Sequence, residues 1–397
     1  AKEAGHYEVS LQGIKKQFLR ICEFYFRTKS FSGILLSSEM HGFAMLDRDS
    51  KPLTDYISWK DERSLEDENG KSIYEELSGE LDLSFREITG MKPRPSLPFF
   101  NLIHLAKKKQ IKEARVITLP DWLAMSSDDS TGQSHDTMTA GLGLYDVQSR
   151  AISKRLLELA EAKAGVKLSF NRVTNSIVVA GNLHLRGRKI PIYTGVGDHQ
   201  CALLGAGNRL DETLSINIGT GSQVSAITGR YSMSERYDIR PFFENNFLKT
   251  ITHIPAGRAL NAHLNFLNSI GKKNYWSELG KITGEDLDRS DLNFDLALFG
   301  SAWNYDGGGK ITAISEKNLN VKNYLSSMIR TLAESYLKAA MIVDPGNRLK
   351  TIVMSGGVPQ KIPALVSKIK KSGGRKVVIM KNIDETLIGL GMLANKL

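Results

Sequence analysis

The chain has 397 residues and a formal net charge of +10, with 41% hydrophobic and 24% charged residues. This length exceeds what one ordinary hydrophobic core holds and favours two domains, and no apolar run is long enough to cross a bilayer. The positive charge suits an anionic partner such as a nucleotide, but the basic residues are scattered and no nucleic-acid-binding motif accompanies them. We therefore expect no nucleic acid and no membrane among the partners.

The two cysteines indicate a reducing compartment. Cys22 and Cys201 lie far apart in the sequence, which argues against a disulfide framework and favours a cytoplasmic location. The first six residues, 1–6, lack the apolar core of a signal peptide. The chain does not begin with Met, so we expect it to be trimmed or incomplete at this end.

Apolar runs of strand length alternate with amphipathic helices, which predicts an α/β protein. In the first half, strands are expected at 34–36, 43–46, 115–118, 176–180 and 191–194, and helices at 151–164 and from 199 to about 205. In the second half, the pattern predicts a hairpin of 214–218 and 223–228, a helix over 321–343, strands at 351–354 and 377–380, and a closing helix over 385–397.

A break in this pattern separates the two halves of the chain. Gly205, Gly207 and Asn208 interrupt a predicted helix just before a new strand begins. We therefore predict a domain I over residues 1–207 and a domain II over residues 208–397.

The stretch 194–200 carries the first group that could act chemically. It reads Thr-Gly-Val-Gly-Asp-His-Gln, and its two glycines allow a sharp turn and a close approach to a ligand. Asp198 then stands at the start of a helix, whose partial positive charge keeps a carboxylate ionised and able to accept a proton from a bound alcohol. An Asp in this place can also be a helix N-cap with no catalytic role, so both interpretations stay open.

Two glycine-rich segments could hold a nucleotide. Segment 219–222, Gly-Thr-Gly-Ser, is a predicted hairpin turn whose backbone N–H groups and hydroxyls could bind a phosphate. Segment 355–358, Ser-Gly-Gly-Val, follows a buried strand, a place where a base and ribose could lie against bare backbone. Each segment can equally be a tight turn that needs no ligand. The GxxxxGK[ST] phosphate loop and the GxGxxG dinucleotide fingerprint are both absent.

A fourth segment suits a ligand rich in hydroxyl groups. Glu39, Met40 and His41 place donors and acceptors in a turn between two predicted strands. A single His in such a turn is also common as a purely structural residue. The other histidines show no metal-ligand spacing, so we expect no zinc site.

Taken in order, these segments resemble the FGGY family of carbohydrate kinases across essentially the whole chain. The stretches 38–47, 51–53 and 57–63 look like the family's sugar-site segment and its Trp-x-Asp-x-Arg continuation. The stretch 197–200 falls where the family carries its Gly-Asp-x-Gln catalytic motif. The remaining similar segments are 87–90, 97–98, 119–123, 134–146, 217–222 and 355–357.

The resemblance implies a fold and an activity. The fold would be the two-domain actin-like (ribonuclease H-like) ATPase fold, with the sugar bound in a cleft between the domains. The activity would be ATP-dependent phosphorylation of a ketose, such as sedoheptulose or xylulose, or of a related polyol, with Mg²⁺ and with Asp198 as general base. The implied sugar contacts are Glu39, Met40, His41 and Gln200. The implied nucleotide contacts are Gly219, Thr220, Gly221, Ser222, Gly356, Gly357 and Lys361.

The sequence departs from the family in two places. The family opens with a strand and an Asp-x-Gly-Thr phosphate loop, and this chain starts after that point. We therefore expect domain I to lack its leading strands, and the absent Asp would have helped Asp198 to hold the metal. The second departure is Gln360–Lys361, which stands where the family often has an Asn or Ser.

Two other classes of function stay open on the sequence. One is a catalytically impaired sugar-binding remnant or regulator of the same fold, and the other is a different actin-like ATPase, such as a chaperone-type or filament protein. Within the family, segments 238–242 and 299–301 look most like sedoheptulokinase-type members. The sequence leaves the oligomeric state open, a homodimer included.

Overall fold

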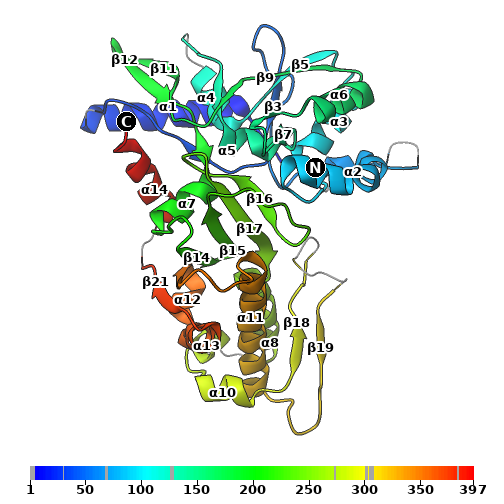
Figure 1. The fold of residues 1–397 in the computed structure, drawn as a ribbon, viewed down its shortest axis with the longest axis vertical. Coiled ribbons are helices and arrows are strands. Elements are labelled where there is room, and N and C mark those ends of the chain that lie inside the picture. The colour runs from blue at the N-terminus through cyan, green and yellow to red at the C-terminus, as the bar shows by residue number, and fades with distance from the viewer. Residues whose placement is uncertain are drawn as a thin grey trace. The chain divides into compact units, whose positions relative to one another are not determined.

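The computed structural model describes residues 5–29, 31–67, 70–125, 129–271, 274–299, 303, 308–381 and 384–397 (Figure 1). The chain forms two compact units. The first comprises Ala1–Gly205, Arg230–Phe247 and Asp384–Leu397, and the second comprises Ala206–Gly229 and Leu248–Ile383. Residues 300 and 301, on which part of the subgroup prediction rests, lie outside the described residues.

The path of the chain is more interleaved than one boundary implies. Residues 230–247 and 384–397 follow the predicted boundary at 207 in sequence, yet they pack within the first unit. Contacts between residues distant in sequence decide this membership, and composition alone does not reveal them. That residues 1–207 bind the sugar and residues 208–397 bind the nucleotide stays a prediction.

The first unit contains small sheets surrounded by helices. Its main sheet has the order β3-β5-β9, with β3 antiparallel and β9 parallel to β5. Its elements are β1 (Glu8–Val9), α1 (Leu11–Thr28), β2 (Ser37–Ser38), β3 (Ala44–Leu46), β4 (Tyr56–Ile57), α2 (Ile73–Thr89), α3 (Pro98–Lys108), β5 (Glu113–Ile117), α4 (Leu119–Met125), β6 (Gln133–His135), α5 (Asp136–Thr139), β7 (Tyr145–Asp146), β8 (Ala151–Ile152), α6 (Lys154–Ala164), β9 (Lys167–Phe170), β10 (Arg172–Thr174), β11 (Val179–Leu185), β12 (Arg188–Tyr193), β13 (Val196–Gly197), α7 (Asp198–Gly205), β16 (Asp238–Pro241) and α14 (Glu385–Ala394).

Helix α2 shows how the sequence sets these elements. Ser72 and Glu75 form a reciprocal capping box at its start, and Gly90 ends it in the left-handed conformation with φ 70°. Its apolar residues recur every four positions and enter a core with residues of α3, α6 and the main sheet. The buried members from α2 are Ile73, Leu77, Leu81 and Phe85.

Several predicted elements of this unit are confirmed, with shifted ends. The helix expected over 151–164 begins at Lys154, because Ser153 caps it and Ala151–Ile152 pair with Tyr145–Asp146 instead. The strand expected at 34–36 is wrong in position: Ile34 makes only an isolated bridge to Ile192, and the ladder forms at Ser37–Ser38. The physical reason is the partner, because β13 offers its hydrogen bonds to Ser37 and Ser38.

The second unit is built around one larger sheet, and β18 and β19 form a separate antiparallel pair. The strands of the larger sheet have the order β17-β15-β14-β20-β21, with β14 antiparallel to β15 and parallel to β20. The elements are β14 (Thr213–Ile218), β15 (Ser222–Thr228), β17 (Phe247–Ile254), α8 (Gly257–Gly271), α9 (Tyr275–Leu279), α10 (Gly284–Arg289), β18 (Asn293–Asp295), β19 (Lys310–Thr312), α11 (Val321–Val343), β20 (Thr351–Ser355), α12 (Gly357–Lys361), α13 (Pro363–Gly373) and β21 (Lys376–Ile379).

The predicted hairpin, long helix and two strands of this half are confirmed. Helix α11 covers the expected residues, and Asn320 caps it by accepting the N–H of Asn323. Its buried residues follow helical spacing, from Tyr324 through Met328 and Leu332 to Tyr336. Parallel pairing of β20 with β14 then places the residues after these two strands at one end of the sheet.

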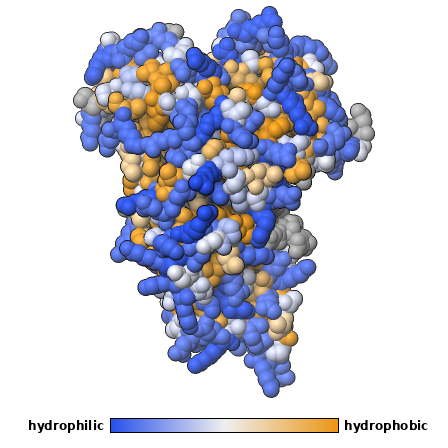
Figure 2. Space-filling view, viewed as in Figure 1, coloured by the Kyte–Doolittle hydropathy of each residue, from blue (hydrophilic) through white to orange (hydrophobic). Residues whose placement is uncertain are grey.

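The surface is mixed. On the face drawn in Figure 2, hydrophilic residues cover most of the area, and hydrophobic residues form smaller regions between them. Across the helices that the structure describes, none combines the length and the apolar composition needed to cross a bilayer.

Candidate active site

Two carboxylates follow a pair of parallel strands in the first unit. Strand β13 runs parallel to β2, with Gly197 opposite Ser38. Asp198 begins α7 directly after β13, and Glu39 comes directly after β2. The ends of parallel strands meet at one edge, which is where ligands bind in open α/β sheets. The predicted catalytic and sugar-contacting segments are therefore brought together.

Asp198 is half-buried, and its surroundings make it more basic than a free Asp. Burial raises the pKa of Asp198, and the negative charge of Glu39 raises it further, while the positive charge of Arg240 lowers it. Its Oδ1 accepts the N–H of the next residue, His199, at 2.7 Å. An N-cap accepts the N–H two or three residues later, so this bond differs from the predicted cap alternative.

Glu39 is held in place by neighbouring hydroxyls. The Oγ of Ser58 donates to Glu39 Oε1 at 3.1 Å. Burial, followed by the charges of Glu39 and Asp198, raises the pKa of Tyr56, so its hydroxyl stays a protonated donor beside the two carboxylates. Tyr56 was missed in the sequence, although it directly precedes the segment 57–63 that carries the resemblance.

Met40 and Gln200 meet at Gly197. A β-carbon at Gly197 would collide with the amide oxygen of Gln200 and would lie 2.8 Å from the sulfur of Met40. Gln200 is fully buried, and its Nε2 donates to the carbonyl of Pro241 at 3.1 Å. Its Oε1 has no hydrogen-bond partner among the described residues, so it is an unfilled acceptor close to Asp198.

Two histidines frame this region. His41 adopts a left-handed conformation, with φ 64°, and its Nδ1 lies 3.0 Å from the carbonyl oxygen of Gly141, to which it donates. His199 is buried, and burial together with the charge of Arg240 lowers its pKa to about 3. His199 is therefore neutral at physiological pH and cannot provide a positive charge to a ligand.

The two glycine-rich segments lie side by side in the second unit. Asn217 of β14 pairs with Ser355 of β20, and its side-chain amide donates to the Ser355 hydroxyl at 2.8 Å. Gly356 has φ 89°, and a β-carbon there would collide with the Ile218 carbonyl just before Gly219. The residues predicted to bind phosphate and adenosine are thus neighbours in one unit.

The structure adds the start of α8 to this neighbourhood. The N–H of Gly257 donates to the Gly219 carbonyl at 3.1 Å, and the N–H of Arg258 donates to the Thr220 carbonyl at 2.9 Å. The first turn of a 15-residue helix thereby adjoins the turn between β14 and β15. A helix N-terminus favours negative charge. Sequence analysis missed it because no capping motif precedes Gly257.

The side chains of Ser222 and Lys361 have different surroundings. The Ser222 hydroxyl is buried and donates to the Ile254 carbonyl at 2.9 Å, so it links the start of β15 to the end of β17. Lys361 ends α12, and its Nζ lies 5.4 Å from the centre of the Trp276 ring. Trp276 in turn donates from Nε1 to Asn261 Oδ1 at 3.1 Å.

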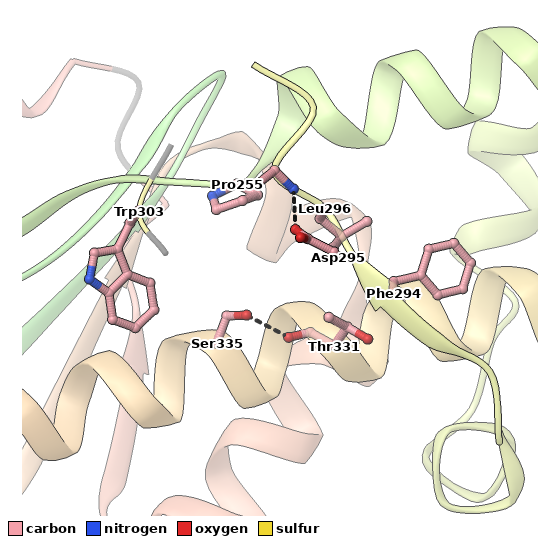
Figure 3. Close-up of a pocket in the computed structure, with 8 residues that line it drawn as sticks. Pro255, Phe294, Asp295, Leu296, Trp303, Thr331 and Ser335 are labelled. Atoms are coloured by element: carbon pink, nitrogen blue, oxygen red, sulfur yellow. Dashed lines mark hydrogen bonds between the residues drawn. The ribbon is translucent and has the colours of Figure 1, made fainter. Parts of the chain in front are cut away.

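A cavity of about 200 Å³ lies elsewhere in the second unit, beside α11 (Figure 3). Asp295 accepts the N–H of Ala297 at 3.0 Å, and Ser335 donates to the Thr331 carbonyl at 2.9 Å on its wall. No predicted site residue lines it. The lining residues are Pro255, Phe294, Asp295, Leu296, Ala297, Trp303, Thr331 and Ser335.

Few side chains near the candidate site could coordinate a metal ion. Within the part of the chain that the structure describes, no group of three or more His, Cys, Asp or Glu side chains is arranged to hold a metal ion. Mg²⁺ in phosphate-binding sites is often held by one or two carboxylates together with phosphate oxygens and water. Asp198 and Glu39 supply two carboxylates, as many as a Mg²⁺ ion held together with phosphate and water needs from the protein.

Comparisons with known proteins support this picture. Residues 9–205 match the N-terminal domain of the FGGY family of carbohydrate kinases, whereas no curated protein matches the chain. A gluconate kinase from Lactobacillus acidophilus has 16% identity and a TM-score of 0.82, over 100% of this chain and 82% of that one. A xylulose kinase from Rhodospirillum rubrum has 15% identity and a TM-score of 0.83, over 100% of this chain and 82% of that one. Plasmodium falciparum glycerol kinase with ADP has 15% identity and a TM-score of 0.77, over 99% of this chain and 82% of that one.

These similarities extend over both units. The predicted α/β, two-domain actin-like ATPase fold is confirmed by them. The sedoheptulokinase-type subgroup stays a prediction, because no such protein is among these relatives. The predicted resemblance is confirmed as well: the chain belongs to the FGGY family of carbohydrate kinases, which are phosphotransferases.

Proposed function

We propose that this protein transfers the γ-phosphoryl group of ATP to a hydroxyl of a sugar, with Asp198 as the general base. The acceptor would be a ketose, such as sedoheptulose or xylulose, or a related polyol. The observation that carries the proposal is the pairing of β13 with β2, because it sets Asp198 and the Glu39–His41 segment at the ends of adjacent parallel strands.

The sugar would bind among polar groups of the first unit. The Tyr56 hydroxyl is a donor, and Glu39 and the amide oxygen of Gln200 are acceptors. Sugar hydroxyls both donate and accept hydrogen bonds, so a site with both donors and acceptors can distinguish sugars by the positions of their hydroxyls. His41 and Met40 would complete the contacts, as the family resemblance implies.

The nucleotide would bind to the second unit. The 219–222 turn and the start of α8 would face its phosphates, since backbone N–H groups and a helix N-terminus favour anions. Gly356, Gly357 and Lys361 would lie along the adenosine. When bound with ATP, Mg²⁺ supplies charge neutralisation for the phosphates, and Asp198 is the carboxylate that we expect to face it.

The reaction would use the raised basicity of Asp198. Its carboxylate would accept the proton of the sugar hydroxyl as that oxygen forms a bond to the γ-phosphorus in line with the bond that breaks to ADP. The proton then remains on Asp198 and is released to solvent after the products leave. A half-buried carboxylate with a raised pKa is a better proton acceptor than an exposed one.

The test is ADP release by the full-length protein with ATP and Mg²⁺ across a panel of acceptors. The panel holds D-xylulose, D-ribulose, D-sedoheptulose, D-gluconate, xylitol and glycerol. We expect sugar-dependent ADP release with at least one ketose or polyol. No sugar-dependent ADP with any acceptor would overturn the proposal. Thermal stabilisation by a sugar without ADP release would indicate a sugar-binding regulator, and ATP-dependent polymerisation would indicate a filament protein.

A further inference from the structure

Residues 230–247 join the first unit next to the proposed base. Within this segment, the N–H of Ile239 donates to the Gly90 carbonyl at 2.8 Å, and the Pro241 carbonyl accepts from Gln200 at 3.1 Å. Strand β16 therefore lies against the first turn of α7, two residues from Asp198. Arg240 sits between these two anchored positions.

Strand alternation fixes the direction in which Arg240 points. Ile239 is fully buried in an apolar cluster with Ala140, Tyr145, Val147 and Phe247. Successive side chains of a strand point to opposite faces, so Asp238 and Arg240 share the face that this cluster does not occupy. The positive charge of Arg240 lowers the pKa of both Asp198 and His199, the first two residues of α7.

The charges on this face are unevenly paired. Asp238 is one carboxylate between two guanidinium groups: it accepts from Arg240 at 3.0 Å and lies 3.9 Å from Arg94. Its other oxygen is taken by the N–H of Lys92 at 3.2 Å. One carboxylate thus serves two arginines, and its oxygens are already engaged.

Arg240 also keeps a donor without a partner. Only 5% of Arg240 is exposed, and its Nε has no hydrogen-bond partner among the residues that the structure describes. The Nε of Arg94, which faces the same carboxylate, also has no hydrogen-bond partner among the described residues, whereas other arginines outside this cluster are satisfied at this atom. Arg63 Nε donates to Asp61 at 2.7 Å, and Arg375 Nε donates to Asn347. An unpaired N–H on a buried guanidinium is costly, which points to an oxygen that arrives with a ligand.

We propose that Arg240 binds the sugar and selects acceptors that carry an oxygen at one defined position. A guanidinium has only donors, so it requires an acceptor oxygen: the carbonyl or ring oxygen of a ketose, a hydroxyl, or the carboxylate of an aldonate. A sugar that lacks this oxygen leaves the buried donor unpaired and is rejected. This inference rests on the proposed function and deepens it by naming what the site reads.

The experiment is a mutant cycle on kcat/KM between Arg240 and the oxygens of the substrate. The full-length protein is assayed with the best acceptor of the panel and with each of its monodeoxy derivatives. The variants are Arg240→Gln and Arg240→Lys, the second keeping a charge for Asp238 if the first folds poorly. In the unmodified protein, we expect one derivative to lose about 10- to 100-fold in kcat/KM, the size of a hydrogen bond to a charged group.

The cycle separates binding from structural support. In both Arg240 variants, kcat/KM for the parent sugar should fall by a similar factor. Removing the same oxygen from the sugar should then lower kcat/KM little further. Equal losses for the parent sugar and every derivative would overturn the proposal. Arg86→Lys is the matched control, because Arg86 anchors the same segment by donating to the Glu235 carbonyl at 2.6 Å, and it should affect all sugars equally. Absence of turnover with every panel sugar would instead contradict the proposed function itself.

Discussion

Gly197 lies directly opposite Ser38 in a parallel strand pair, so the residues that follow them, Asp198 and Glu39, leave the same end of that pair. Two carboxylates in such a position repel each other when both are ionised. Ser58 donates a hydrogen bond to Glu39 Oε1 at 3.1 Å. Burial and the charge of Glu39 both raise the pKa of Asp198, which suits a proton acceptor.

Glu39→Gln should therefore change the pH dependence of the reaction. Burial and then Glu39 raise the pKa of Asp198. A base acts only when deprotonated, so activity is lost as the pH falls through this raised pKa. Removing the charge of Glu39 lowers that pKa, and the acidic limb of kcat/KM should move to lower pH. Ser58→Ala keeps the charge and should move the limb less. A limb that stays in place or moves to higher pH in Glu39→Gln would contradict this reasoning.

The adjacent glycines of the adenosine segment should respond differently to alanine. Gly356 has φ 89° and touches the Ile218 carbonyl, so Gly356→Ala should cost about 1–3 kcal/mol of unfolding free energy. Gly357 is exposed with open space around its α-carbon, so Gly357→Ala should leave stability nearly unchanged and raise the KM for ATP. Thermal unfolding and ATP titrations measure the two effects. Equal stability losses in both variants would be inconsistent with the described turn.

The contact between α7 and α14 offers a second matched pair of glycines (Figure 1). A β-carbon at Gly389 would collide with the Cys201 carbonyl, three residues after Asp198, whereas none of the described atoms comes near Gly391. Gly389→Ala should cost about 1–3 kcal/mol by forcing the helices apart. Gly391→Ala should be neutral or stabilise by up to about 1 kcal/mol, since Ala favours helix. Denaturant unfolding of the two variants checks this, and the reverse order would refute the packing.

Acid should destabilise the protein partly through His199. Burial lowers its pKa to about 3, below the unfolded value of about 6.5. Its contribution to stability is complete above pH 6.5 and is lost as the pH falls toward 3, by at most about 1.4 kcal/mol per pH unit. His199→Gln should flatten the decline of melting temperature between pH 6.5 and 4. A slope in His199→Gln identical to that of the unmodified protein would count against a buried, neutral imidazole.

Local sequence patterns were sufficient for elements whose own periodicity and end signals agree. Helix α11 was placed at its observed ends because its apolar residues recur at helical spacing and Pro345–Gly346 follow. The hairpin β14–β15 was found because Gly219–Thr220–Gly221 separate two apolar runs. The proximity of the 219–222 turn to Gly356 follows from the parallel pairing of β14 with β20, which no local pattern reveals.

The parts of the candidate site that escaped prediction depend on pairing over long sequence distances. Tyr56 acquires its role only because β2, β4 and β13 bring it to Glu39 and Asp198. Arg240 is a candidate because Asp238 lies between two arginines, one of them 144 residues away in the sequence. Burial and unpaired donors are tertiary properties, so residue types and spacing could not supply them.

The most direct test of the account compares the full-length protein with its Asp198→Asn variant, using the acceptor that gives the highest ADP release. Asn has the size of Asp but cannot accept the proton, so kcat should fall by at least about 100-fold, while sugar binding and melting temperature remain close to those of the unmodified protein. An Asp198→Asn variant that transfers phosphate at the unmodified rate would contradict the assignment of this carboxylate as the base.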